Sequence, residues 1–246
     1  MKTQSLFPLA SRWGGSLIIF GLAARVALAA TVQSRNENDA IGQIGCVSNE
    51  NGVFVRISEA GGILASSDGR CWSERTLGIR TFMRGVNYGA GLFVAVGGSY
   101  VDLPGVILTS ADGLNWNRRQ SGTKKNLYGV AYGNATFVAV GDDGAILVSR
   151  TGVDWRSSHP PSAELLTAVT YGNGRFLAVG EQGLTLTSID GLHWGKSSVG
   201  SAIYFNRVSF INGLFTATSS NASFFSSDGR IWAPRNAITN LVMKTK

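Results

Sequence analysis

The chain has few of the residues that metal sites and catalytic triads require. Its 246 residues include only two histidines and two cysteines. His159 and His193 have no partner at the spacing of a metal-ligand set or a triad, and no Cys-x-x-Cys motif is present. The sequence therefore predicts no metal, no cofactor and no catalytic residue.

A strong charge of one sign is also missing. The formal net charge is +7, and it falls to +4 if an N-terminal signal carrying three basic residues is removed. The densest basic groups are Arg118-Arg119 with Lys124-Lys125, and Arg75, Arg80 and Arg84. All of them fall between repeat units, where solvated loop charges are expected, so nucleic acid is not an expected partner.

The N-terminus resembles a secretory signal. Lys2 and Arg12 precede an apolar stretch, 17–30, which ends in the small-x-small pattern Ala27-Leu28-Ala29. Arg25 interrupts this stretch, and a membrane-spanning helix needs about 20 apolar residues in a row. We predict a secretory signal peptide over 1–29, an exported (periplasmic or extracellular) protein, and no stable membrane span after cleavage.

Five copies of one pattern, Ser-x-Asp-Gly-x-x-Trp, follow. The tryptophans are Trp72, Trp116, Trp155, Trp194 and Trp232, at spacings of 44, 39, 39 and 38 residues. The acidic position holds Asp68, Asp112, Thr151, Asp190 and Asp228. This is the period of a four-stranded blade. Helical periodicity is absent after the signal, so the fold expected over 41–237 is an all-β propeller of five four-stranded blades, between an N-terminal segment (30–40) and a C-terminal tail (238–246).

Each repeat contains a hairpin signal before a central phenylalanine. The phenylalanines are Phe54, Phe93, Phe137, Phe176 and Phe215. A short turn such as Asn173-Gly174 precedes each one, and Asn-Gly between apolar runs favours a two-residue hairpin because both residues tolerate positive φ. The second repeat has an enlarged loop over 97–105, which explains its longer spacing.

We interpret the repeated motif as a folding device. The Asp side chain can accept hydrogen bonds from backbone N–H groups one or two residues on, Gly supplies positive φ, and Trp buries its ring between sheets. The alternative is a row of calcium or sugar sites. One carboxylate per turn supplies too few oxygens for a calcium ion, which takes 6–8 ligands.

The two cysteines, Cys46 and Cys71, both lie in the first repeat. In an exported chain they could form a disulfide that fastens the terminal blade, and two buried free thiols are the alternative.

The motif resembles the Asp-box, or BNR, repeat of sialidase-type propellers. The longer unit Tyr-Gly-Asn-Gly-x-Phe-x-Ala-Val-Gly, at 171–180, resembles bacterial BNR-like propellers related to the photosystem II assembly-factor family. The resemblance covers roughly 41–237 and implies a propeller that is six-bladed in sialidases and seven-bladed in the assembly factors. This chain has five units, and its Asp-Gly spelling is one residue shorter than that of the sialidases.

Positions that differ between repeats indicate where a ligand could bind. The strand-entry position, two residues before an invariant valine, holds Gly45, Arg84, Tyr128, Thr167 and Asn206. We expect the last four to ring one mouth of the central channel, beside the turn residues Asp142, Asp143 and Glu181. Arg207 is a further candidate, because its counterparts in other repeats are small. The alternative is that all these residues are solvated rim residues.

The function expected is an exported, non-enzymatic propeller that binds a protein or glycan through its loop face, as an assembly or envelope scaffold. The alternative is a sialidase-like glycoside hydrolase with its site at the channel mouth, where a carboxylate pair roughly 5 to 9 Å apart would be required. A third hypothesis is that a second chain closes a five-bladed ring. The oligomeric state and the ligand stay open.

Overall fold

The computed structural model describes residues 47–49, 51–98 and 105–235. The predicted signal peptide, the segments 30–40 and 238–246, Cys46 and most of the enlarged loop lie outside these residues. Within them no helix is long and apolar enough to span a membrane. The described chain forms five antiparallel four-stranded sheets, each from consecutive strands, which confirms the predicted fold class.

The blades follow the repeats in order. Blade 1 contains β1 (Val47–Ser48), β2 (Phe54–Ile57), β3 (Ile63–Ser66) and β4 (Ser73–Arg75). Blade 2 contains β5 (Phe82–Gly89), β6 (Leu92–Gly98), β7 (Val106–Ser110) and β8 (Asn117–Arg119). Blade 3 contains β9 (Leu127–Gly133), β10 (Thr136–Gly141), the 3-10 turn η2 (Asp142–Gly144), β11 (Ile146–Ser149) and β12 (Arg156–Ser157).

The last two blades repeat this plan. Blade 4 contains β13 (Leu166–Gly172), β14 (Arg175–Gly180), η3 (Glu181–Gly183), β15 (Leu184–Ser188) and β16 (Gly195–Ser198). Blade 5 contains β17 (Arg207–Ile211), β18 (Leu214–Thr218), β19 (Ser223–Ser226) and β20 (Ala233–Pro234). In blades 2 to 5 the first hairpin turns as expected: in blade 3, for example, both turn residues, Asn134 and Ala135, have positive φ of 47° and 52°, as in a type I′ turn. Blade 1 differs, because the pairing of Ser48 with Phe54 leaves a connection longer than two residues.

The core lies between blades rather than within them. Because side chains alternate along a strand, β6 presents Phe93 and Ala95 to blade 1 and Val94 and Val96 to blade 3. All four are fully buried. The same alternation produces apolar clusters at the boundaries of blades 1 and 2, 2 and 3, 3 and 4, and 4 and 5.

Glycines allow the inner strands to approach closely. A Cβ on Gly133 would lie 2.0 Å from the ring of Tyr171 in the next blade, and Gly172 meets Phe210 in the same way. Side chains are therefore excluded at these two positions.

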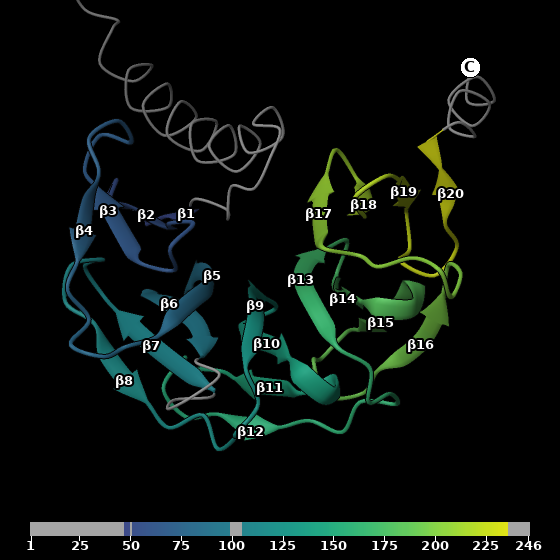
Figure 1. The fold of residues 1–246 in the computed structure, drawn as a ribbon, viewed down its shortest axis with the longest axis horizontal. Helices are drawn as coiled ribbons and strands as arrows, with labels where there is room; N and C mark the ends of the chain where they lie inside the picture. Colours follow the sequence, from purple (N-terminus) through teal and green to yellow (C-terminus); the bar gives the residue numbers. More distant parts are fainter. Residues whose placement is uncertain (1–46, 50, 99–104, 236–246) are drawn as a thin grey trace, which may run out of the picture.

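The five blades form an open arc, and blades 1 and 5 do not meet (Figure 1). Each inner strand contacts the next, from β1 to β5, β9, β13 and β17. No apolar cluster of the described residues joins blade 5 to blade 1. Phe54 is accordingly half-buried, whereas its four counterparts in the other blades are fully buried.

The two end faces of the arc carry polar residues where other blades carry apolar ones. On blade 5, Thr216 and Thr218 replace the buried Leu177 and Val179 of blade 4. On blade 1, Arg56 takes the place of an alanine found in all four other blades, and its guanidinium lies 4.4 Å from the centre of the Trp72 ring. Polar outer faces are typical of the terminal units of repeat proteins.

Candidate functional site

Three of the four predicted mouth residues are bulge residues of inner strands. The pairing of β5 with β6 skips Arg84, that of β9 with β10 skips Tyr128, and that of β13 with β14 skips Thr167. A bulge leaves one residue outside the ladder and redirects its side chain. This explains why the position differs in every repeat, since the ladder places no demand on it.

The bulge side chains reach across to the following blade. The Arg84 guanidinium lies 4.9 Å from the centre of the Tyr128 ring, in the geometry of a cation–π contact, and both residues are half-buried. The Thr167 hydroxyl donates to the carbonyl of Phe205, at 2.6 Å. Arg84 and Tyr128 therefore come together at the start of the inner strands, while Thr167 fastens blade 4 to blade 5.

Asn206 and Arg207 stand at the start of β17, and both are exposed. The neighbouring Val208 packs toward blade 4, so alternation places Arg207 on the opposite, end face of blade 5. Its counterparts in blades 2 and 3, Gly85 and Gly129, lie against the next inner strand. Arg207 can be large because no blade follows blade 5.

The turn carboxylates are engaged by their own blades. One oxygen of Asp142 accepts from the backbone and side-chain nitrogens of Asn126, at 3.3 and 3.0 Å. Glu181 accepts in the same way from the backbone N–H of Leu165, at 3.0 Å. Asp143 pairs with Lys125, and this contact raises the pKa of the Lys125 ammonium. Asp142 and Glu181 therefore hold strand entries in place.

Glu164, on the same loop face, has a pKa below its usual value. Its main cause is a hydrogen bond from the Lys196 ammonium, 3.0 Å from the carboxylate. A general acid needs a raised pKa. Across the described ranges no group of three or more His, Cys, Asp or Glu side chains could hold a metal ion.

The Ser-Asp-Gly turns have one geometry. In blade 2 the Asp112 carboxylate accepts from the backbone N–H groups of Leu114 and Asn115, at 2.8 and 2.9 Å, and Ser110 accepts from Gly113. The Asp carboxylate thus accepts from the backbone N–H groups two and three residues further along the chain, whereas one and two residues were expected. In the third copy the Thr151 hydroxyl makes longer contacts, 3.2 and 3.4 Å.

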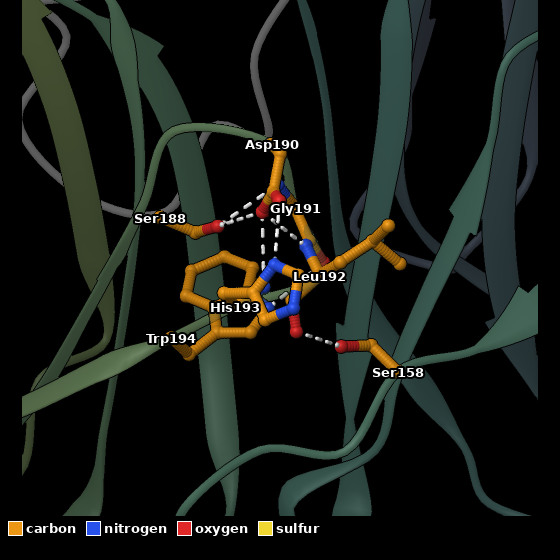
Figure 2. A network of polar contacts seen from close by, with 7 residues as sticks. All are labelled: Ser158, Ser188, Asp190, Gly191, Leu192, His193 and Trp194. Carbon is orange, nitrogen blue, oxygen red and sulfur yellow. Dashed lines mark hydrogen bonds and ion pairs between the residues drawn. The ribbon is translucent and has the colours of Figure 1, made fainter.

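These hydrogen bonds stabilise the charged carboxylates. The backbone N–H groups of Arg70 and Cys71 lower the pKa of Asp68 to about 2. Burial raises the pKa of the Asp190 carboxyl. Hydrogen bonds with the backbone N–H and ring of His193 and with the backbone N–H of Leu192 lower it by more, so the net change is a decrease. Figure 2 shows this carboxylate over its own turn, while Ser158 of blade 3 donates to the carbonyl of Leu192 at 3.0 Å.

The turns of blades 2 to 5 also fasten each blade to the preceding one. The glycine of the blade 4 turn, Gly191, packs on Val138 of blade 3, and the ring nitrogen of Trp194 donates to the Gly191 carbonyl at 2.9 Å. These contacts support the structural interpretation of the motif. Cys71 is exposed in the blade 1 turn, so the alternative of a buried free thiol is wrong for this residue, and the disulfide with Cys46 stays a prediction.

The face that carries these turns has two adjoining hollows that the sequence did not indicate. One has a volume of about 810 Å³ between blades 3 and 4, and the other about 330 Å³ between blades 4 and 5. Asp190 lines both, with Arg150 and Arg156 in the first and Arg175 in the second. The sequence signal for Arg150, Arg156 and Arg175 is that their counterparts in the other repeats are uncharged.

No family model and no curated protein matches this chain. Solved structures do. YCF48 from Cyanidioschyzon merolae is 16% identical, with 78% of this chain and 71% of that chain covered and a TM-score of 0.58. YCF48 bound to D1 peptide is also 16% identical, with 78% and 70% covered and a TM-score of 0.56.

A third similar structure is PorZ, an essential bacterial surface component of the type-IX secretion system of Porphyromonas gingivalis. It is 10% identical, with 78% of this chain and 27% of that chain covered and a TM-score of 0.55. Identities this low carry information about fold alone. The five sheets and the similar structures together establish that the chain is a β-propeller of five four-stranded blades.

Proposed function

We propose that this chain is a non-catalytic scaffold that binds a segment of a partner protein at the channel mouth. The observation that carries the proposal is the contact between Arg84 and Tyr128. Two bulge residues from neighbouring blades stack on each other, and neither belongs to a strand ladder. Arginine and tyrosine are enriched at the centres of protein interfaces. Asn206 and Arg207 add exposed polar groups beyond the mouth in blade 5.

The similar structures support a protein partner at the level of the fold. One of them is YCF48 bound to a D1 peptide, so a propeller of this kind can hold a peptide. We extend the proposal to two further points: the repeats are of the BNR kind, and the protein is exported. The uniform Ser-Asp-Gly turns support the first, and the surface location of PorZ is consistent with the second.

The hydrolase alternative receives less support from the loop face. Asp142, Glu181, Asp143 and Glu164 each hydrogen-bond or pair within the propeller. An acid–base pair would need carboxyl groups directed at a shared substrate position.

The test is a binding assay with wild-type protein and an Arg84→Ala, Tyr128→Ala double variant. Each is used to capture partners from an envelope extract of the source organism and is also applied to a glycan array. Arg118→Ala, an exposed arginine on the outer strand β8, is the matched control. Thermal melts establish that all variants fold.

We expect a protein partner retained by wild type and by the control and lost in the double variant. Capture that is equal in all three proteins would refute the mouth as the binding site. A ligand found only on the glycan array would replace the protein partner with a carbohydrate. Hydrolysis of a fluorogenic sialoside by wild type, abolished in the double variant, would overturn the non-catalytic proposal.

A further inference from the structure

Arginines gather on the face opposite the mouth, around the two hollows between blades 3, 4 and 5. Arg150 and Arg156 line the larger hollow, and Arg175 and Arg230 line the smaller one. We call these four residues and the two hollows the arginine groove. Asp190 lies in both hollows, so the groove is continuous across two blade boundaries. Its larger part, about 810 Å³, is in the range of pockets that hold ligands.

At the positions of three of these arginines the other blades have no positively charged residue. The position of Arg150 holds Ser67, Ala111, Ile189 and Ser227 in the other blades. That of Arg156 holds Ser73, Asn117, Gly195 and Ala233, and that of Arg175 holds Val53, Leu92, Thr136 and Leu214. Four blades fold with small or uncharged residues at each position. Arg175 donates to the backbone carbonyl of Asp228 in blade 5, at 3.2 Å, so the case for a role beyond the fold rests on Arg150 and Arg156.

The groove has a net positive charge. Its lining contains four arginines and two aspartates, Asp154 and Asp190, and Arg175 also interacts with the Asp228 carboxylate. The Asp190 carboxylate is already occupied by the hydroxyl, backbone and ring donors of its own turn (Figure 2). By contrast, the side chains of Arg150 and Arg156 are exposed and make no hydrogen bond or ion pair within the described residues. Planar guanidinium groups bind carboxylates through paired hydrogen bonds.

Apolar side chains lie between the charges. Trp155 and Leu192 are half-buried in the lining of the larger hollow, and Ile189, which is 68% exposed, lies in the lining of the smaller one. A ligand that fits this surface has carboxylates for the arginines and apolar groups for the tryptophan, leucine and isoleucine. An extended peptide supplies both along its length, whereas a sulfated glycan supplies the charge with little apolar surface.

We propose that the arginine groove binds an acidic segment of a protein, with carboxylates on Arg150 and Arg156 and an apolar side chain beside Trp155. This site is separate from the mouth and lies on the other face of the blades. Because the arginines are solvent-accessible, the affinity falls as salt rises.

The test measures fluorescence anisotropy of a labelled peptide in which Glu and Asp alternate with Leu. The matched peptide has Gln and Asn in place of the acids. The protein variant carries residues that other blades use at the same positions: Arg150→Ser with Arg156→Ser. Arg118→Ala is the control for net charge, and a sulfated oligosaccharide is the second ligand.

We expect the acidic peptide to bind wild type and Arg118→Ala equally, within about twofold, and to bind the double serine variant at least about tenfold more weakly. The neutral peptide should not bind. Equal affinity for all variants, or no binding of the acidic peptide, would overturn the proposal. Groove-dependent binding of the oligosaccharide alone would assign the site to an anionic glycan and overturn the peptide assignment. The Arg84→Ala, Tyr128→Ala variant should retain the peptide, which separates this result from that of the mouth.

Discussion

Replacing the central phenylalanine by alanine in an end blade and in an inner blade measures whether the arc is open in solution. Phe137 in blade 3 is fully buried. Its ring centre lies 4.5 Å from that of Tyr132 and 6.3 Å from that of Trp155, and Val94 and Val96 of blade 2 pack against it. Phe54 occupies the same place in blade 1, but no blade covers it.

The expected cost differs between the two positions. Phe137→Ala removes a buried ring and leaves an enclosed cavity, which lowers the free energy of unfolding by about 3 to 5 kcal/mol. Phe54→Ala removes a ring that already contacts solvent on its end face, so the loss is limited to a partial transfer term of about 1 to 2 kcal/mol. The difference of about 2 kcal/mol is well within the resolution of urea unfolding.

The assay is urea unfolding followed by tryptophan fluorescence, repeated over a hundredfold range of protein concentration. An open arc predicts the smaller loss for Phe54→Ala and a midpoint that does not depend on concentration. If Phe54→Ala costs as much as Phe137→Ala, another surface covers blade 1 and the reasoning is refuted. A midpoint that rises with concentration would identify that surface as a second copy of the chain.

Three further predictions use the same unfolding assay. Asp112→Ala should lower the free energy of unfolding by about 1 to 2 kcal/mol, because it leaves two backbone N–H groups without an acceptor. Thr151→Asp should raise the free energy of unfolding by about 0.5 to 1 kcal/mol. Equal effects at both sites would contradict the role given to the carboxylate. Gly133→Ala should cost more than 2 kcal/mol, because the new Cβ would lie 2.0 Å from the Tyr171 ring; a neutral result would show that the inner strands can separate. The pKa of about 2 at Asp68 lies below the value of about 3.9 in an unfolded chain. The ionised carboxylate therefore stabilises the folded state above pH 4, and this stabilisation is lost as the pH falls toward 2. Unfolding midpoints at pH 6, 4 and 3 test this, and a constant midpoint would contradict it.

Local signals predicted most of the fold. The turn chemistry of Asn134 and the regular spacing of the tryptophans depend on neighbours a few residues away. The hairpin of β9 and β10 therefore follows from the sequence, whereas the bulge at Tyr128 that shifts its register was not predicted. The same holds for the Ser-Asp-Gly turns, except that their N–H partners are one residue further along than expected.

The candidate site was predicted in part. The repeat comparison identified Arg84 and Tyr128 as variable strand-entry residues, and the two side chains do meet. It also selected Thr167, which donates to the carbonyl of Phe205 in the next blade, and Asp142, which accepts from Asn126 of its own blade. Variation between repeats identifies positions that the common ladder does not constrain, but it does not distinguish a ligand contact from a contact specific to one blade.

The sequence by itself determined the repeat, the four strands of each unit and the turns that join them, because these depend on short-range backbone preferences and on alternation along a strand. Only the tertiary structure decided that the five blades form an open arc and that Arg207 and Thr216 stand on an end face. It alone brought the arginines of blades 3, 4 and 5 around adjoining hollows. These features depend on which blade packs against which, and side chains far apart in the chain determine that packing.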